Sequence, residues 1–520
     1  MINQRTIHLL LLLALSTISS GMWWILKGGN INGDEAVIGL MALKISHGVD
    51  FPFFFWQAHY GGPIASYLSA PLHWLWEPSG WVLHAILIPM HITFVIGIYL
   101  TAQKWLKEES AFVAAIFTAM PFSLFPYSPL GGYTESLVIL PWIVYLFFGL
   151  DDTVKLKTYW RYFGGGILNG FALWVFPISV PMILVSFFYL YRETDRNKGN
   201  MALLGFAFAL IPMIYYNLKH PAGTFLRLFS RPLHADKQTF IGLLRSDGIL
   251  HSATNLAKEW FSSAFHSLLN LPQFVLSLMG LSANESYWLE FSGIISLVAL
   301  VLALWFCLGS QARGRTIPRV WGAMVITNIA YVVLFGMQRD RYLIPLLVLI
   351  PFGLSIILTV HLNNKGKYLR YFIIPIILFM NCLSNYTGSN QIQNNYSEFA
   401  KYLETKGMRT GYADYFTAYP ITYLSNERLI FTPVFNTPES DRYALYTQLV
   451  SESRNPVFIF YDNSTEVIPF KEKMRALEVH TDEQVWQNYR IFSNLSPLHR
   501  AHRLPVPWTG DYEMVREICR

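Results

Sequence analysis

Residues 81–101 read WVLHAILIPMHITFVIGIYLT, a stretch without Asp, Glu, Lys or Arg that is long enough to cross a bilayer as one helix. Similar apolar blocks follow one another along the chain. All of them together are residues 8–26, 64–76, 81–101, 110–127, 135–150, 162–176, 178–191, 201–216, 291–309, 320–337, 342–360 and 370–384. The 64–76 block is short and contains Pro71 and His73, so we interpret it as a re-entrant or interfacial helix. The others predict an all-α polytopic membrane domain with about 11 transmembrane helices.

The composition favours a membrane protein over a nucleic-acid-binding protein. The 520 residues are 53% hydrophobic and only 14% charged, whereas a soluble chain usually carries about a quarter charged residues. The formal net charge of +6 comes from Lys and Arg in short clusters between the apolar blocks. Such clusters report membrane topology, so we expect no nucleic-acid partner. Two of the three cysteines, Cys307 and Cys382, lie in apolar blocks, which argues against a disulfide framework or a cysteine zinc site.

The basic clusters predict the orientation of the chain. If the N-terminus is cytoplasmic, every cluster in a short loop but one falls on the cytoplasmic side. The cytoplasmic clusters are Lys104 and Lys107; Lys155, Lys157 and Arg161; Arg192, Arg196 and Lys198; Arg313, Arg315 and Arg319; and Lys365, Lys367 and Arg370. The odd number of spans then places outer loops 27–63 and 217–290 and the C-terminal part outside. We therefore expect a multi-pass protein of the inner (plasma) membrane with a periplasmic or extracellular C-terminal domain.

The C-terminal part differs from the rest of the chain in its sequence pattern. Within residues 385–520, helical patterns such as 396–406 alternate with strand-like runs such as 409–415. This alternation predicts a small C-terminal α/β extracytoplasmic domain. We therefore divide the chain into a transmembrane domain, residues 1–384, and an outer domain, residues 385–520.

Two adjacent carboxylates, Asp34 and Glu35, follow the first span in outer loop 27–63. A carboxylate beside the membrane can act as a general base and accept a hydroxyl proton. An acid before an apolar helical run can equally be an ordinary capping residue, and composition alone leaves both readings open. The same loop continues to Pro63 through His59 and Tyr60, which we expect to contribute to substrate binding.

A second acidic motif is Leu130-Gly131-Gly132-Tyr133-Thr134-Glu135, in the predicted outer turn between the third and fourth spans. Glu135 opens an apolar helix, so helix-start electrostatics alone would account for it. The glycine pair, however, permits a tight turn and the close approach of backbone to a ligand. Two glycine-flanked acidic motifs on one face favour a site over capping, and we expect Tyr133 to bind substrate there.

The exception to the charge rule is Gln338-Arg339-Asp340-Arg341-Tyr342, at the predicted outer mouth of a late span. Two outer arginines predict an anionic partner such as a lipid phosphate or pyrophosphate, although a salt bridge within the chain is the alternative. Tyr342 belongs to the same candidate substrate site. An enzyme on the outer face has no supply of ATP or nucleotide sugar, so an activated donor has to arrive on a lipid. We therefore expect a sugar linked to polyprenyl phosphate.

The order of these parts resembles the GT-C superfamily of membrane glycosyltransferases. Within it, the chain is most similar to the dolichyl-phosphate-mannose mannosyltransferase-like branch, with the protein O-mannosyltransferases and the lipid A aminoarabinose transferase. The segments that carry the resemblance are Gly33-Asp34-Glu35-Ala36, Gly131-Gly132-Tyr133-Thr134-Glu135, Trp174-Val175-Phe176-Pro177, Asp340-Arg341-Tyr342-Leu343-Ile344-Pro345 and Gly411-Tyr412-Ala413-Asp414-Tyr415. Together they span residues 1–435 or so, and each motif is short.

The resemblance implies an inverting hexosyl- or pentosyltransferase. In such an enzyme an acceptor hydroxyl attacks the anomeric carbon of the sugar and displaces polyprenyl phosphate. Asp34 would be the general base, Glu35 its neighbour and alternative, and Glu135 the second acid. Arg339 or Arg341 would stabilise the leaving phosphate. Some relatives need a divalent metal, but the outer acids here are few, so we expect no obligatory metal or other cofactor.

Two other functions stay open. Polysaccharide polymerases and O-antigen ligases also join lipid-linked sugars outside the membrane, and Arg227, Arg231 and His234 in loop 217–290 fit that alternative. The early Asp34-Glu35 pair and the folded C-terminal domain argue against it. A non-enzymatic transporter of lipid-linked sugars would need ionisable residues near the bilayer midplane and usually internal repeats. In this sequence the candidate acids, Asp34, Glu35 and Glu135, lie at the ends of predicted spans and not near the bilayer midplane. The acceptor, whether glycan, lipid or protein, is open.

Overall fold

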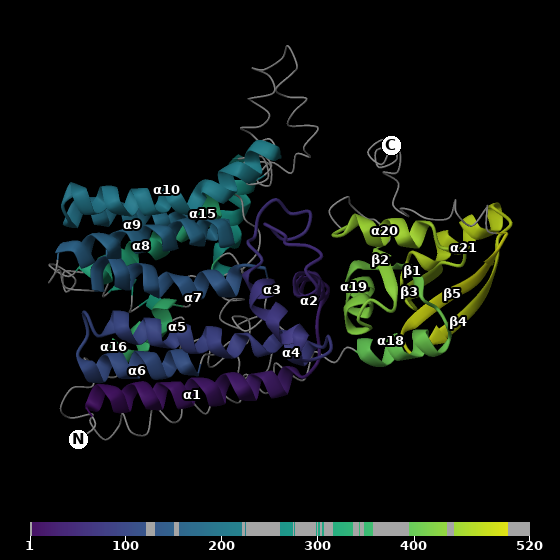
Figure 1. Cartoon of the computed structure of the whole chain (residues 1–520), viewed down its shortest axis with the longest axis horizontal. Coiled ribbons are helices and arrows are strands. Elements are labelled where there is room, and N and C mark those ends of the chain that lie inside the picture. The colour runs from purple at the N-terminus through teal and green to yellow at the C-terminus, as the bar shows by residue number, and fades with distance from the viewer. Residues whose placement is uncertain are drawn as a thin grey trace, which may run out of the picture. The chain divides into compact units, whose positions relative to one another are not determined.

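The computed structural model of the chain describes residues 3–120, 131–149, 155–220, 224, 261–273, 275, 298, 300–301, 304–305, 316–335, 343, 348–356, 395–433 and 441–497. The chain divides into two compact units. The first comprises Met1–Leu26, His59–Ile64 and Ile86–Gln391, and the second comprises Lys27–Ala58, Ala65–Ala85 and Ile392–Arg520. Figure 1 labels their helices and strands.

The described part of the first unit is helical. Its elements are α1 (Gln4–Lys27), α5 (Leu87–Ala102), α6 (Glu108–Ala119), α7 (Tyr133–Val144), the π-helix η3 (Tyr145–Gly149), α8 (Lys155–Val175), the 3₁₀-helix η4 (Pro177–Ser179), α9 (Val180–Glu193), α10 (Arg196–Lys219), α15 (Thr316–Leu334) and α16 (Leu349–Ile356). Helices α8, α9 and α10 run side by side, and α5 packs against α6 and α7 (Figure 1). Aromatic and aliphatic side chains, including Phe117 and Trp321, form one buried core between these helices.

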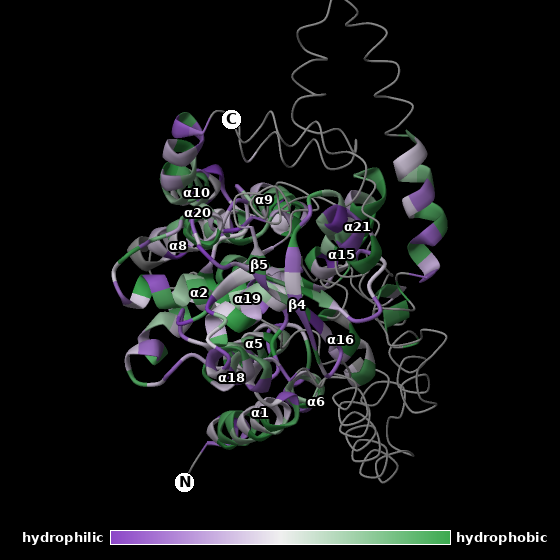
Figure 2. Cartoon of the chain, turned by 90° about the vertical axis from the view of Figure 1, so that its right-hand side faces the viewer, coloured by the Kyte–Doolittle hydropathy of each residue, from purple (hydrophilic) through white to green (hydrophobic). Residues whose placement is uncertain are grey.

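Four described helices are long and apolar enough to cross a membrane. They are Gln4–Lys27, Gly80–Ala102, Arg196–Lys219 and Ile317–Leu334, and a shorter apolar helix spans Tyr133–Phe148. Hydrophobic residues dominate α1 in Figure 2. These helices support the predicted membrane domain. They do not establish the predicted count of about 11 spans, because several of the apolar blocks lie wholly or partly outside the described residues.

Glycine lets α8 and α10 approach to backbone contact. A Cβ atom at Gly166 of α8 would overlap the carbonyl oxygen of Ala202, and one at Gly205 of α10 would overlap that of Phe163. Small residues at such crossings are typical of helix pairs in membranes, where close van der Waals packing drives association.

The second unit contains a five-stranded sheet with strand order β2-β1-β3-β5-β4. The strands are β1 (Thr410–Ala413), β2 (Ile430–Pro433), β3 (Val457–Tyr461), β4 (His480–Trp486) and β5 (Tyr489–Ser496). The pairs β1–β2 and β1–β3 are parallel, whereas β3–β5 and β4–β5 are antiparallel. The edge strand β4 is largely exposed and is mostly hydrophilic in Figure 2.

Helices cover this sheet on both faces. They are α18 (Tyr396–Thr405), α19 (Tyr415–Leu424), α20 (Ala444–Ser451) and α21 (Val467–Ala476). Side chains alternate across a strand, so Val457 and Ile459 of β3 join a core with residues of α18 and α19, while Phe458 and Phe460 join a separate core with α20 and α21. The predicted α/β fold of the C-terminal part is confirmed.

Part of the first outer loop belongs to the same compact unit as the sheet. Residues 27–58 of this loop contribute α2 (Gly33–Ser46), which packs against α19. Residues 65–85, which follow the loop, belong to the same unit and contain most of α3 (Ile64–Ser69), the 3₁₀-helix η1 (Ala70–Trp74) and α4 (Gly80–Ala85). The sequence-based division places all of these residues in the transmembrane domain of residues 1–384. The boundary predicted at residue 384 lies outside the described residues. Helices α3 and η1 form the 64–76 block, and neither is long enough to cross a bilayer.

Candidate active site

The two adjacent acids lie in the first turn of α2, and Glu35 caps this helix. The N-cap residue is Asn32, whose Oδ1 accepts a hydrogen bond from the Glu35 N–H at 2.9 Å. Glu35 Oε2 in turn accepts one from the Asn32 N–H at 3.0 Å. This reciprocal capping box satisfies two backbone donors that the helix leaves without an internal partner.

Glu35 is also the centre of a buried charge cluster. Its side chain is 1% exposed, forms an ion pair with Lys27 at the end of α1 and lies 3.4 Å from Nε2 of His84 on α4. Burial raises the pKa of Glu35, but Lys27 and then His84 outweigh that effect and hold the pKa below its ordinary value. Glu35 is therefore ionised, and both of its oxygens are engaged.

Asp34 has a different environment although it is the next residue. Its side chain is half-buried, and the Tyr415 hydroxyl donates a hydrogen bond of 2.6 Å to Oδ1. In the part of the chain that the structure describes, the Asp34 carboxylate has no other hydrogen-bond partner and no ion pair. Of the two acids, Asp34 is therefore the one whose carboxylate is partly exposed and contacts a hydroxyl group.

Tyr415 comes from the C-terminal sheet region, at the first position of α19. Burial raises its pKa, and the neighbouring Asp34 carboxylate raises it further, whereas Arg442 acts in the opposite direction. The phenol therefore keeps its proton and acts as the donor to Asp34. Gly33 makes this approach possible, because a Cβ atom at Gly33 would lie 2.8 Å from Cδ1 of the Tyr415 ring.

Arg442 is a second partner of Tyr415, and its guanidinium carbon lies 5.7 Å from the centre of the Tyr415 ring. Its Nε donates to the Tyr415 hydroxyl oxygen at 3.4 Å, and one terminal nitrogen donates to the Trp56 carbonyl at 3.4 Å. The guanidinium carbon is 5.0 Å from the centre of the Phe55 ring, and Trp56 stacks on Tyr443 at 4.4 Å. These aromatic contacts join the first outer loop to the segment before α20.

The second acidic motif lies in the first unit. Glu135 is buried in the first turn of α7, and its Oε2 accepts a hydrogen bond of 2.9 Å from the Gly132 N–H. Gly131 and Gly132 both have positive φ, and a Cβ atom at Gly132 would lie 2.7 Å from the Val175 carbonyl oxygen. The glycine pair is therefore needed for a tight turn that packs against the C-terminal end of α8.

Three of the expected substrate-binding residues also lie in the first unit. Tyr60 and Tyr133 both contact the Phe176 ring, with centroid distances of 6.0 Å and 4.4 Å. His59 has a positive φ, and its Nδ1 lies 2.8 Å from the Tyr216 hydroxyl. The structure thus brings Tyr60 and Tyr133 together around one aromatic residue.

Arg339, Arg341 and Tyr342 lie outside the described residues, as do Arg227, Arg231 and His234 of the alternative site. Asp34 and Glu35 belong to the second compact unit and Glu135 to the first. Sequence reasoning did not assign a role to Tyr415 or Arg442. The sequence did point to the segment that contains Tyr415, because Gly411–Tyr415 is one of the segments that resemble the GT-C superfamily.

Neither a protein-family model nor a curated protein sequence matches this chain. Solved structures do match it. The oligosaccharyltransferase of Archaeoglobus fulgidus in complex with Zn and sulfate is 12% identical, with a TM-score of 0.53 over 89% of this chain and 69% of that one. ArnT of Cupriavidus metallidurans bound to undecaprenyl phosphate is 10% identical, with a TM-score of 0.58 over 94% of this chain and 98% of that one.

The chain has the GT-C fold. Both structures are membrane glycosyltransferases of the GT-C superfamily, so the resemblance seen in the short motifs is confirmed at the level of fold. A third match, AglB from Archaeoglobus fulgidus with an inhibitory peptide and a dolichol-phosphate, has a TM-score of 0.51 over 94% of this chain and 76% of that one at 13% identity. These matches cover 89% to 94% of this chain.

Proposed function

We propose that this GT-C protein is an inverting glycosyltransferase that moves a sugar from a polyprenyl-phosphate-linked donor to an acceptor hydroxyl on the outer face of the membrane. The observation that carries the proposal is the Asp34 carboxylate on this fold. Asp34 is partly exposed, and it already accepts a hydrogen bond from a hydroxyl group. That is the interaction a general base makes with an acceptor hydroxyl before it takes the proton.

In the proposed reaction, Asp34 takes the proton of the acceptor hydroxyl while the acceptor oxygen forms a bond to the anomeric carbon. The bond between that carbon and the phosphate oxygen breaks, and its electron pair leaves with polyprenyl phosphate. Attack from the face opposite the leaving group inverts the anomeric centre and needs one base, in contrast to the paired carboxyl groups of a retaining enzyme. Arg339 or Arg341 is proposed to stabilise the phosphate.

The environments of the two adjacent acids support Asp34 rather than Glu35 as this base. Glu35 uses one oxygen for the Asn32 N–H and the other for Lys27 and His84, and it is buried. If Glu35 took up a proton, its ion pair with Lys27 would be lost and the Lys27 charge would have no carboxylate partner there. Glu35 is better suited to hold the start of α2, and with it Asp34, in place. Glu135 is proposed to position the acceptor or the donor.

The similar structures support the class of donor and acceptor. One was solved with undecaprenyl phosphate, and another with a dolichol-phosphate and an inhibitory peptide. We propose a lipid-linked hexose or pentose as donor and a glycan, lipid or protein as acceptor, in the inner (plasma) membrane with a cytoplasmic N-terminus.

A metal ion is not part of the proposed mechanism. The oligosaccharyltransferase structure contains Zn. Among the described residues of this chain, no group of three or more His, Cys, Asp and Glu side chains could hold a metal ion. We therefore derive no step through a metal, and our expectation of no obligatory metal stays a prediction.

Mass spectrometry of lipid-linked sugars tests the proposal directly. Membranes from cells without the protein should accumulate one polyprenyl-phosphate sugar, and the wild-type gene should remove it. Asp34→Asn should leave the sugar at the level of the deletion, because loss of a general base costs about 10²- to 10⁴-fold in rate. Asparagine keeps an oxygen for the Tyr415 hydroxyl, so the fold should be preserved.

The matched control is Asp195→Asn. Asp195 is the N-cap of α10, where its side chain accepts a hydrogen bond from the Lys198 N–H, and asparagine is an equally good N-cap. This variant should consume the donor as the wild type does. Full donor consumption by Asp34→Asn would refute the assignment of the base.

A further inference from the structure

The Tyr415 hydroxyl occupies the position on Asp34 that a reacting hydroxyl needs. A general base has to lie about 2.6–3.2 Å from the oxygen whose proton it takes. The Tyr415 oxygen meets this requirement at 2.6 Å from Oδ1 of Asp34. In the proposed reaction, the acceptor hydroxyl and the Tyr415 hydroxyl would therefore compete for the same carboxylate.

Asp34 binds the Tyr415 hydroxyl but does not activate it. Burial raises the pKa of Tyr415, and the Asp34 carboxylate raises it further. A phenol in this state keeps its proton at neutral pH and cannot act as a nucleophile. The contact therefore occupies Oδ1 of Asp34 while the proton stays on the phenol oxygen.

The rest of the Tyr415 side chain is held independently of this hydrogen bond. The ring rests on Gly33, and Asp414, the N-cap of α19, accepts a hydrogen bond of 2.9 Å from the Phe416 N–H. Arg442 Nε already donates to the Tyr415 oxygen. This oxygen thus keeps a partner when Asp34 turns to another hydroxyl, and the exchange costs only one hydrogen bond.

We infer that Tyr415 is a positioning residue that substitutes for the acceptor hydroxyl on Asp34 until an acceptor displaces it. The inference rests on the proposed function. It gives the C-terminal domain a role in the reaction: through Tyr415, with Arg442 as the second partner of its oxygen, this domain excludes small hydroxyl compounds from the base. An acceptor with additional binding contacts can displace the phenol, whereas water, which lacks such contacts, competes poorly.

Water is therefore the probe that reveals this role. In the unwanted reaction, the oxygen of water forms a bond to the anomeric carbon and Asp34 takes one of its protons. The bond from the anomeric carbon to the phosphate oxygen breaks, and polyprenyl phosphate leaves with the electron pair. Removing the Tyr415 hydroxyl while keeping its ring should open Asp34 to this hydrolysis.

The experiment uses the full-length protein in detergent and the lipid extract of cells that lack the protein, which supplies the accumulated donor. Release of free sugar without added acceptor is measured for the wild type, Tyr415→Phe and Tyr415→Phe combined with Asp34→Asn. We expect Tyr415→Phe to raise this hydrolysis about tenfold, since a hydrogen bond to a charged group is worth at least that factor. The double variant should show no hydrolysis above background.

Tyr402→Phe is the matched control. It removes a hydroxyl of the same unit that donates to Gln484 at 3.0 Å, and it should leave hydrolysis at the wild-type level. Equal melting temperatures of the two Tyr→Phe variants would show that the fold is intact. Unchanged or slower hydrolysis in Tyr415→Phe, with a lower kcat and an unchanged KM for acceptor, would mean that the phenol only orients Asp34 and would overturn the inference.

These outcomes separate the inference from the proposed function. If the function itself is wrong, the wild type will not consume the accumulated lipid with any acceptor, and Asp34→Asn will change nothing. If only the inference is wrong, the wild type will transfer the sugar and Asp34→Asn will abolish transfer, while Tyr415→Phe will not raise hydrolysis.

Discussion

A Cβ atom on Gly39 of α2 would lie 2.5 Å from Cε2 of the Tyr423 ring on α19. Tyr423 is fully buried, and its hydroxyl donates to the Ser79 carbonyl at 3.1 Å, so the ring cannot move aside easily. The helix that carries Asp34 and the helix that carries Tyr415 are therefore in contact through a glycine.

Gly39→Ala should separate these two helices. Overpacking of a tight contact costs about 1–3 kcal/mol, so we expect a lower melting temperature of the protein in detergent, measured by intrinsic fluorescence. Gly21→Ala in α1 is the control, because a Cβ atom there has no neighbour within 4 Å. The same melting temperature for both variants would show that the α2–α19 contact is looser than the structure indicates.

Gly166→Ala should weaken the α8–α10 pair. Its Cβ atom would overlap the Ala202 carbonyl oxygen, which belongs to the backbone of α10 and cannot rotate away. We expect a drop in melting temperature, and Gly205→Ala should behave in the same way. Gly164→Ala, two residues earlier in α8, has no neighbour within 4 Å and should be close to wild type. If Gly164→Ala is the more damaging of the two changes in α8, the helix pairing is wrong.

Lys27→Met should leave the Glu35 carboxylate buried without its main ion-pair partner. Breaking one side of a buried pair costs about 3–5 kcal/mol, and Lys27→Met combined with Glu35→Met should recover part of that loss. The pKa of Glu35 is lowered in the folded protein. Its contribution to stability is therefore complete above the ordinary value of 4.5 and disappears as the pH falls through the folded pKa.

The advantage of the wild type over Lys27→Met should accordingly shrink as the pH falls below 4.5, as measured by melting temperatures between pH 7 and pH 3. A constant difference over this range would contradict the assignment of the stabilising charge to Glu35.

His73 should make the second unit less stable on mild acidification. Its Nδ1 donates to the Ser69 carbonyl at 2.9 Å, and its Nε2 lies 3.0 Å from the Tyr423 hydroxyl. Burial lowers the pKa of His73, the Ser69 hydrogen bond partly opposes this, and His47 lowers it further. As the pH falls, His73 therefore binds a proton at a higher pH in the unfolded chain than in the folded protein. This contribution to stability is complete above pH 6.5 and is lost as the pH falls from 6.5 through the folded pKa.

The comparison for this prediction is His73→Gln, which does not titrate. Between pH 8 and pH 5 its melting temperature should fall less than that of the wild type. Parallel curves for the two proteins would show that His73 protonates equally well in the folded and unfolded states.

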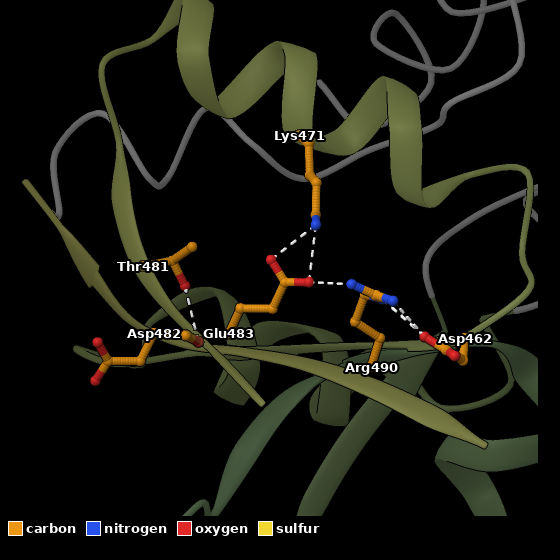
Figure 3. A network of polar contacts seen from close by, with 6 residues as sticks. All are labelled: Asp462, Lys471, Thr481, Asp482, Glu483 and Arg490. Carbon is orange, nitrogen blue, oxygen red and sulfur yellow. Dashed lines mark hydrogen bonds and ion pairs between the residues drawn. The ribbon is translucent and has the colours of Figure 1, made fainter. Parts of the chain in front are cut away.

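Arg490 on β5 links two carboxylates at the surface of the sheet. Figure 3 shows Glu483 between Lys471 and Arg490, with Arg490 reaching Asp462 on its other side. The hydrogen bond from Lys471, followed by that from Arg490, lowers the pKa of Glu483. Glu483→Gln should cost no more than about 1 kcal/mol at pH 7, because exposed pairs are screened by solvent. Raising the salt concentration should shrink this difference in unfolding free energy. A loss that salt does not change would indicate a packing effect instead.

The sequence was sufficient for features that depend on neighbouring residues. Apolar blocks predicted membrane helices, and the alternation of patterns after residue 395 predicted the α/β sheet region, because periodicity is a local property. The starts of α2 and α7 were also predictable, because each helix has its N-cap residue and a capping glutamate three residues apart. These residues are Asn32 and Glu35 in α2, and Gly132 and Glu135 in α7. The predicted roles of Arg339, Arg341 and Tyr342 remain untested, because these residues lie outside the described part of the chain.

Only the tertiary structure shows that Asp34 and Glu35 have different surroundings. In the sequence they are adjacent acids with the same flanking glycine, and either could have been the base or the cap. Glu35 points to Lys27 and His84, whereas Asp34 accepts the hydroxyl of Tyr415, 381 residues further along the chain. Burial and charge neighbours decide what a carboxylate does, and both come from chain segments that meet only after folding. The sequence alone determined that two acids stand at the start of this helix, and the packing of α19 against α2 determined which of them contacts the Tyr415 hydroxyl.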